Sequence, residues 1–117
     1  MGTNDESIIR TWILVADSAE ARVFLSYPGQ QGWFELKTFR HPQGRAAEDF
    51  AHQLAGYLEE SLEKNQFERL ILVSPPEFLG LLRAGLSKPV QDRVVDSMNK
   101  DLVSLPMDEL EDRISEH

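Results

Sequence analysis

A run of apolar residues that stops at two prolines constrains the fold of this chain more than any other feature. Residues 68–74 (ERLILVS) hold a continuous apolar run from Leu70 to Val73, which is typical of a strand buried on both faces. Pro75 and Pro76 follow at once, and apolar periodicity resumes directly after them. Ser74 with Glu77 three residues later matches a capping box, and Pro76 suits the first turn of a helix. The segment therefore predicts a central strand that leads straight into a helix.

Three further strands and a long helix are predicted before this segment. Residues 11–17 form an apolar run of β-formers, and residues 21–27 and 33–40 alternate apolar with polar side chains. Short polar links join the three strands, as in an antiparallel meander. Apolar side chains then recur at three- and four-residue spacing over residues 45–64, which predicts an amphipathic helix that ends at Asn65.

The part of the chain after the proline turn predicts three helices and one more strand. One helix follows the prolines, and an apolar stripe predicts a second one over residues 89–100, preceded by Ser87. The members of that stripe are Val90, Val94 and Met98. Residues 101–105 (DLVSL) predict a fifth strand, and Pro106 opens an acidic terminal helix.

The order of these elements predicts an α/β fold. It runs strand, strand, strand, helix, strand, helix, helix, strand, helix. Right-handed crossovers place the fourth strand parallel to the first and beside it, with helices on both faces of the sheet. We expect a mixed five-stranded sheet of the ribonuclease-H-like kind. A chain of 117 residues has room for one core, so residues 11–117 are predicted to form a single domain after a flexible segment over residues 1–10.

Charge and composition exclude several classes of function. The net charge is −8, and residues 46–117 hold the whole excess, with fifteen Asp and Glu against seven Lys and Arg. Such a domain is repelled by polyanions, which disfavours general binding to DNA and binding to membrane surfaces. The chain has no cysteine, so disulfides and thiolate sites are excluded. No apolar run is long enough for a membrane span or a signal peptide, so we expect a cytoplasmic protein.

A metal-dependent nuclease of the ribonuclease-H-like kind is the first enzymatic alternative. Its chemistry needs several carboxylates that converge on metal ions. Asp17, at the end of the first strand, suits this role, and Glu48 or Asp49 could approach it. The fourth strand ends in Ser-Pro-Pro instead of an acid, however, and Asp92 with Asp96 has the spacing of an ordinary solvated helix face.

A serine hydrolase and a histidine metal site are the remaining alternatives. Ser74 with His41 and Asp17 would form a triad, but the serine lacks the Gly-x-Ser-x-Gly elbow. The three histidines, which include His52 and His117, have no paired ligand spacing. No glycine-rich phosphate loop precedes a helix. We therefore predict no catalytic residue, no metal and no cofactor.

Three segments resemble the bacterial host attachment protein family, also called "protein required for attachment to host cells". They are TWILVADSAEARVF, RAAEDFAHQLAGYLEE and FERLILVSPPEFLGLLRAGLS, and the resemblance extends from about Thr11 to Leu110. The strand pair VADSAEARVF and the segment SPPEFLGLLRAGL are its most specific parts. The family is considered a bacterial relative of the middle domain of archaeal and eukaryotic peptide-chain release factors.

The resemblance implies a release-factor-like fold and a role in attachment to host cells. In release factors, the loop before the corresponding helix carries the Gly-Gly-Gln motif that promotes peptidyl-tRNA hydrolysis. This chain has Gln43, Gly44 and Arg45 there, without that motif, so the resemblance does not imply release activity. A ribosome- or RNA-associated role stays open by analogy.

The candidate site is predicted at the carboxyl ends of the central strands, where open sheets bind their ligands. We expect Asp17, Ser74 and Arg83 to line this edge, with His41 and Arg45 on the nearby loop. The leading hypothesis is a non-catalytic cytoplasmic binding protein with a protein partner. The alternative is a ribosome- or RNA-associated factor that contacts phosphate through the two arginines. An ordinary surface charge paired with an acid explains Arg83 equally well, and the oligomeric state is left open.

Overall fold

The computed structural model describes residues 9–42 and 44–115. In these residues the elements follow the predicted order of strands and helices. They are β1 (Thr11–Ala16), β2 (Glu20–Ser26), β3 (Phe34–Arg40), α1 (Ala47–Glu63), β4 (Arg69–Ser74), α2 (Pro76–Gly85), α3 (Lys88–Gln91), β5 (Val94–Asn99) and α4 (Met107–Ser115). None of these helices is both long and apolar enough to cross a membrane.

The five strands form one mixed sheet in the order β3-β2-β1-β4-β5. β1 pairs antiparallel with β2 and parallel with β4, so that Leu14 lies opposite Val23 on one side and Leu72 on the other. β2 and β3 are antiparallel, whereas β4 and β5 are parallel. The predicted mixed sheet, with the fourth strand beside and parallel to the first, is confirmed.

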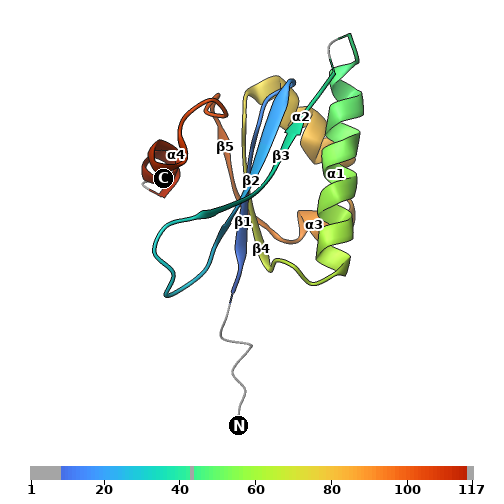
Figure 1. The fold of residues 1–117 in the computed structure, drawn as a ribbon. Helices are drawn as coiled ribbons and strands as arrows, with labels where there is room; N and C mark the ends of the chain where they lie inside the picture. The colour runs from blue at the N-terminus through green and yellow to red at the C-terminus, as the bar shows by residue number, and fades with distance from the viewer. Residues whose placement is uncertain (1–8, 43, 116–117) are drawn as a thin grey trace.

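The sheet lies between two unequal helical layers (Figure 1). The two parallel crossovers, β3 to β4 through α1 and β4 to β5 through α2 and α3, step across the sheet in the same direction. Because such crossovers are right-handed, α1 and α2 must cover the same face. The short α4 covers the opposite face, so helices lie on both faces as predicted.

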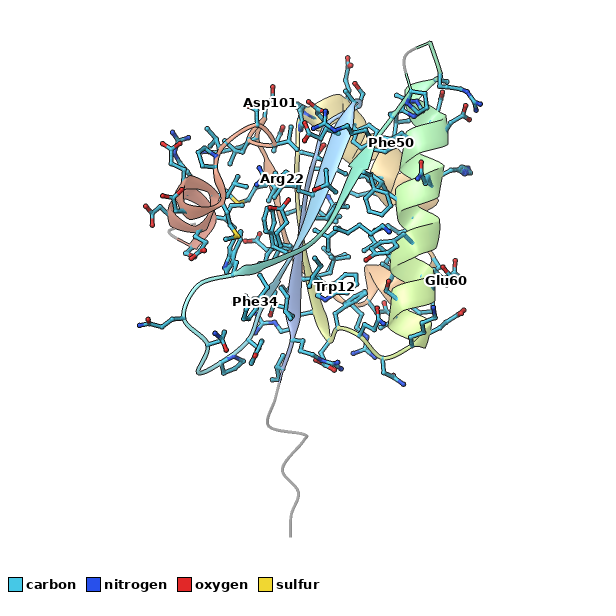
Figure 2. All side chains as sticks on the ribbon, in the orientation of Figure 1. Trp12, Arg22, Phe34, Phe50, Glu60 and Asp101 are labelled. Atoms are coloured by element: carbon cyan, nitrogen blue, oxygen red, sulfur yellow. The ribbon has the colours of Figure 1, made fainter. Side chains whose placement is uncertain are left out.

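Alternate side chains of β1 supply two separate cores. Trp12 and Leu14 pack with Phe50 under α1 and α2 (Figure 2). Ile13 and Val15 belong to the second core, which α4 covers. A strand with cores on both faces needs apolar residues at every position, which explains the continuous apolar runs in β1 and β4.

Asn65 ends α1, as predicted. Its φ angle is 57°, in the left-handed region. The Asn65 N–H donates to the carbonyl oxygen of Leu62 at 2.9 Å, and the Gln66 N–H donates to that of Ser61 at 3.0 Å. These two hydrogen bonds form a Schellman motif, which satisfies the last carbonyl groups of the helix.

The predicted position of the fifth strand is wrong. Residues 94–99 form β5, α3 ends at Gln91, and residues 101–105 form a loop with a turn at residues 103 and 104. A spacing of four residues fits one face of a strand as well as one face of a helix, so the apolar stripe did not distinguish them. A bulge opposite Leu70 also places Val94 against the α1 core and Met98 against the α4 core.

The predicted capping box at Ser74 is also wrong. Ser74 is the last residue of β4, and its carbonyl oxygen accepts the N–H of Lys100 at 3.1 Å. The helix cap is Pro75, whose carbonyl oxygen accepts the N–H of Leu79 at 2.9 Å. Because Ser74 still belongs to the sheet, its hydroxyl group is buried and has no partner among the described residues. Pro76 does lie in the first helical turn, as predicted.

The predicted flexible segment, residues 1–10, lies mostly outside the described residues. Arg10 is within them and is fixed in place. Its N–H donates to Glu68 Oε1 at 2.6 Å, and its guanidinium group pairs with the same carboxylate. Its carbonyl oxygen accepts the N–H groups of Glu68 and Arg69. The ordered domain therefore includes Arg10.

Candidate binding site

A hollow of about 370 Å³ lies where β1 and β4 end and where α1 and α2 begin. The residues that line it come from four segments of the chain. They are Asp17, Ser18, Ala47, Pro75, Glu77, Phe78, Leu81 and Asp101. This lining combines four apolar side chains with three carboxylates and one serine, and it includes no lysine or arginine. The structure thus places a hollow at the predicted edge of the sheet.

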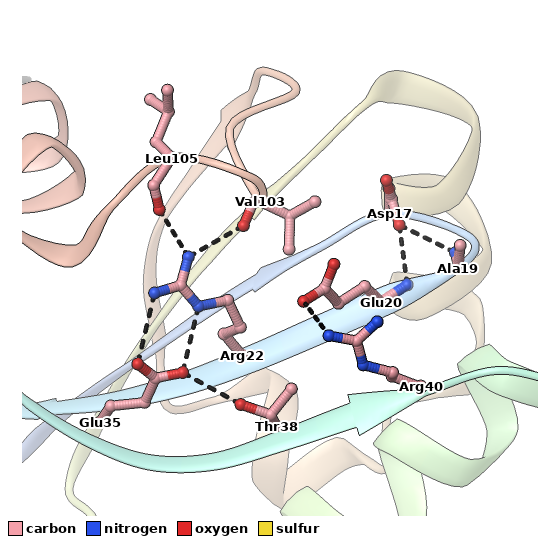
Figure 3. A network of polar contacts seen from close by, with 9 residues as sticks. All are labelled: Asp17, Ala19, Glu20, Arg22, Glu35, Thr38, Arg40, Val103 and Leu105. Carbon is pink, nitrogen blue, oxygen red and sulfur yellow. Dashed lines mark hydrogen bonds and ion pairs between the residues drawn. The ribbon is translucent and has the colours of Figure 1, made fainter.

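Asp17 lies at this edge as predicted, and it also builds the turn between β1 and β2 (Figure 3). Its Oδ1 atom accepts the N–H groups of Ala19 and Glu20, both at 2.8 Å. Its own N–H donates to the carbonyl oxygen of Glu20 at 2.9 Å. One carboxylate oxygen is therefore committed to the turn, and the other makes no hydrogen bond within the described residues.

His41 lies beside the same turn, but its ring holds the following loop. Its backbone N–H donates to the carbonyl oxygen of Ala19 at 2.9 Å. The ring stacks on Phe50 with centroids 4.9 Å apart, and Nε2 is 2.9 Å from the carbonyl oxygen of Ala46. His41 does not line the hollow. Its contacts instead fix the loop that leads into α1.

Access to the hollow differs between two of the predicted site residues, Ser74 and Arg45. Ser74 is fully buried behind Pro75, so it cannot contact a ligand in this conformation. Arg45 is exposed in the loop before α1.

Arg83 does not lie at the predicted edge. It lines a different hollow with Leu86, Gln91 and Val94, and Val94 begins β5. The physical reason is the direction of α2, which runs back from the end of β4 towards the opposite end of the sheet. Arg83 makes no ion pair with Glu77 or any other acid within the described residues.

The carboxylates that the nuclease alternative requires are not brought together. Within residues 9–42 and 44–115, no three histidine or acidic side chains are placed to hold a metal ion. Asp17 and Glu48 line different hollows, and Asp92 pairs with Lys88 at 2.6 Å. The triad that the serine hydrolase alternative requires is not formed either, because Ser74 and His41 share no hydrogen bond.

A second hollow of about 320 Å³ continues along the seam between α1 and α2. Its lining is Glu48, Ala51, His52, Leu81, Ala84 and Gly85. Leu81 lines both hollows, so they lie next to each other on either side of this residue. We call the two hollows together the α1–α2 groove.

Sequence reasoning missed most of this lining. The sequence pattern predicts Glu77 as part of a helix cap and as a possible partner of Arg83, and it predicts Asp101 in a strand. Asp101 in fact lies two residues beyond the end of β5, much as Asp17 directly follows β1. A correct position for β5 would have placed both carboxylates at the same edge.

Comparison with known proteins identifies a family. Residues 45–114, more than half of the 117 residues, match the family described as "Protein required for attachment to host cells". Among curated proteins there is no match.

Solved structures of release-factor-like proteins share the fold. Pelota from Archaeoglobus fulgidus has a TM-score of 0.57 and 20% identity over 89% of this chain and 31% of its own. Pelota from Thermoplasma acidophilum has a TM-score of 0.58 and 17% identity, over 86% and 32%. Dom34 from S. cerevisiae, described as a translation termination-like factor, has a TM-score of 0.57 and 12% identity, over 86% and 31%.

This chain therefore spans about a third of the length of these proteins. At such identities the likeness shows the fold alone. It supports the predicted release-factor-like architecture, whereas the ribonuclease-H-like description stays a prediction.

Proposed function

Because this chain belongs to the family of proteins required for attachment to host cells, we propose that it is a non-catalytic binding protein of the cytoplasm. Its partner is a protein, and its binding surface is the hollow at the carboxyl ends of β1 and β4. The observation that carries this proposal is the convergence of four chain segments on one concave, partly apolar surface. Concave sites with apolar walls and a few polar groups are where proteins bind their partners and ligands.

The composition of the hollow favours a binding role over catalysis. Ala47, Pro75 and Leu81 present apolar surface that remains partly open to solvent. Glu77 and Asp101 are exposed and form no ion pair with any described residue. Apolar contacts would supply affinity, and the carboxylates would select among partners.

A photo-crosslinking experiment tests this function. A benzoylphenylalanine replaces Ser18, an exposed residue of the hollow, and in a second protein it replaces Gln53, an exposed residue of α1 outside both hollows. We expect one protein to be cross-linked in cells from position 18 and not from position 53. Leu81→Gln, which makes the lining of the hollow more polar at similar volume, should then reduce the yield at least tenfold.

Equal yields from positions 18 and 53, or none from either, would contradict a binding role for the hollow.

A ribosome- or RNA-associated function is the second candidate, and the shared fold with a translation termination-like factor favours it. Arg45 is exposed near the hollow, whereas Arg83 lies at the other end of the sheet, so the two arginines can be tested separately. If this function holds, tagged protein should co-migrate with ribosomal particles on a sucrose gradient. High salt and Arg45→Glu should abolish the co-migration, because phosphate contacts are salt-dependent.

Arg83→Glu is the matched control in this gradient, with the same change of charge, and should leave the co-migration unchanged. Recovery of the wild-type protein only at the top of the gradient would exclude this second function.

A further inference from the structure

The α1–α2 groove is longer than the hollow on which the proposed function rests. It starts beside Asp17 and Asp101, passes Leu81, and ends at Ala84 and Gly85. It therefore follows α2 for most of that helix, whose ten residues span about 15 Å. This length suits a short segment of polypeptide better than a small compact ligand.

Small side chains form the floor of the groove. Ala47 and Ala51 lie on the α1 side, and Ala84 and Gly85 lie on the α2 side. The two helices are already in close contact below, because a Cβ atom built on Gly85 would lie 3.6 Å from the Cβ atom of Ala55. The groove is thus a shallow apolar trough that a second chain can approach closely.

All formal charges on the lining residues are negative. The four carboxylates are Asp17, Glu48, Glu77 and Asp101, and no lysine or arginine accompanies them in the lining. Within the described part of the chain, none of the four takes part in an ion pair. Four acidic groups around one apolar trough repel anions and attract cations.

We propose that the α1–α2 groove binds a cationic, amphipathic segment of a partner protein. Apolar side chains of that segment occupy the two hollows, and its lysine or arginine side chains pair with the surrounding carboxylates. The proposal rests on the proposed function and specifies the chemistry of its partner. Charge complementarity selects this occupant, because RNA phosphates and a second copy of this chain, whose net charge is −8, would both be repelled.

A peptide titration of the purified full chain tests the proposal. The probe is an eight-residue amphipathic peptide of four lysines and four leucines, and its counterpart carries four glutamates in place of the lysines. We expect saturable changes in the amide resonances of Ala47, Leu81 and Gly85 with the lysine peptide alone. Changes centred on another surface, or equal changes with both peptides, would overturn the proposal.

Three variants separate the groove from general electrostatic attraction. Glu48→Lys combined with Glu77→Lys should weaken the dissociation constant at least tenfold. The control combines Glu59→Lys with Glu60→Lys, two exposed positions of α1 outside the groove, and should change the constant less than twofold.

Ala84→Trp fills one hollow without changing charge and should also weaken binding at least tenfold. Equal losses in the two charge variants would overturn the proposal, and so would unchanged binding by the tryptophan variant.

This experiment is independent of the cross-linking test of the proposed function. A failed titration overturns the cationic partner and leaves a cross-link from position 18 standing. If a protein is cross-linked from position 18 through a segment without lysine or arginine, the cationic partner is overturned and the proposed function still holds. The absence of any such cross-link overturns the proposed function itself.

Discussion

The guanidinium group of Arg22 in β2 donates a 2.6 Å hydrogen bond to the carbonyl oxygen of Leu105, just before α4 (Figure 3). It also donates to the carbonyl oxygen of Val103 at 3.0 Å and pairs with the carboxylate of Glu35 in β3. Arg22 thus ties the connection between β5 and α4 to the antiparallel part of the sheet. Asp101, which lines the hollow at the ends of β1 and β4, belongs to this same connection.

Arg22→Gln should lower the free energy of unfolding by about 2 kcal/mol, because a largely buried charge-assisted network is lost. The amides of residues 102–105 should also exchange faster with solvent, since their anchor on the sheet is removed. Urea unfolding measures the first effect and hydrogen exchange the second.

Arg40→Gln is the control for this substitution. Arg40 pairs with Glu20 at 3.8 Å on the same strands, but its side chain is 79% exposed. Its loss should therefore cost less than roughly 0.5 kcal/mol. Equal costs at the two positions would contradict the role assigned to Arg22.

Two carboxylates should make the stability depend on pH in acid. The hydrogen bond from Arg22 lowers the pKa of Glu35, and that from Arg10 lowers the pKa of Glu68. A lowered pKa in the folded state means that each charged carboxylate stabilises the fold above its unfolded pKa, near 4.5. This stabilisation is lost as pH falls through the lowered pKa of the folded state.

The double variant Glu35→Gln/Glu68→Gln should therefore be less stable than the wild type at pH 7, and the difference should shrink from about pH 5 downwards. Because both carboxylates are partly exposed, we expect roughly 0.5 to 1 kcal/mol from each pair. Urea unfolding at pH 7 and at pH 3 measures the difference. Glu59→Gln/Glu60→Gln makes the same change of charge at exposed positions, and an identical pH profile there would disprove the explanation.

Ser74→Ala should leave the protein equally stable or stabilise it by about 1 kcal/mol. The hydroxyl group is buried and has no hydrogen-bond partner among residues 9–42 and 44–115, so its removal abolishes an unfavourable desolvation. Thermal or urea unfolding decides the sign. A loss of about 1 kcal/mol would indicate instead that Ser74 caps α2 after all.

Ser61→Ala is the comparison for Ser74. Ser61 is also buried, but its hydroxyl group interacts with Tyr57. Its removal should cost about 1 kcal/mol.

Asn65→Gly should stabilise the protein slightly, whereas Asn65→Ala should destabilise it by roughly 1 kcal/mol. The reason is the φ angle of 57°, which glycine adopts freely and alanine does not. Lys64→Ala, one residue earlier at an ordinary φ of −88°, is the control and should have little effect. A destabilising glycine would show that the Asn65 side chain contributes more than its backbone conformation.

The elements predicted well are those whose local pattern matches a single kind of structure. β1 is apolar from Trp12 to Ala16 and β4 from Leu70 to Val73, because each strand faces two cores. The long stripe of α1 repeats over several turns, and Asn65 marks its end. The prolines mark the boundary between β4 and α2. From these elements and handedness alone, the mixed sheet and its edge near Asp17 could be predicted.

The elements predicted badly are those whose local pattern matches two kinds of structure. The four-residue spacing of Val94 and Met98 fits a helix and a strand equally well. Only the pairing of this segment with β4 makes it a strand. That error displaced Asp101 from the candidate site.

The sequence by itself determined the fold class, the family and the edge of the sheet at which the hollow lies, because periodicity, proline placement and motifs are local properties of the chain. Tertiary structure alone decided which side chains meet there. The direction of α2 took Arg83 away from the edge, and the pairing of β4 buried the hydroxyl group of Ser74. Such contacts join residues far apart in sequence, as Arg22 and Leu105 do, and the packing of whole elements sets their geometry.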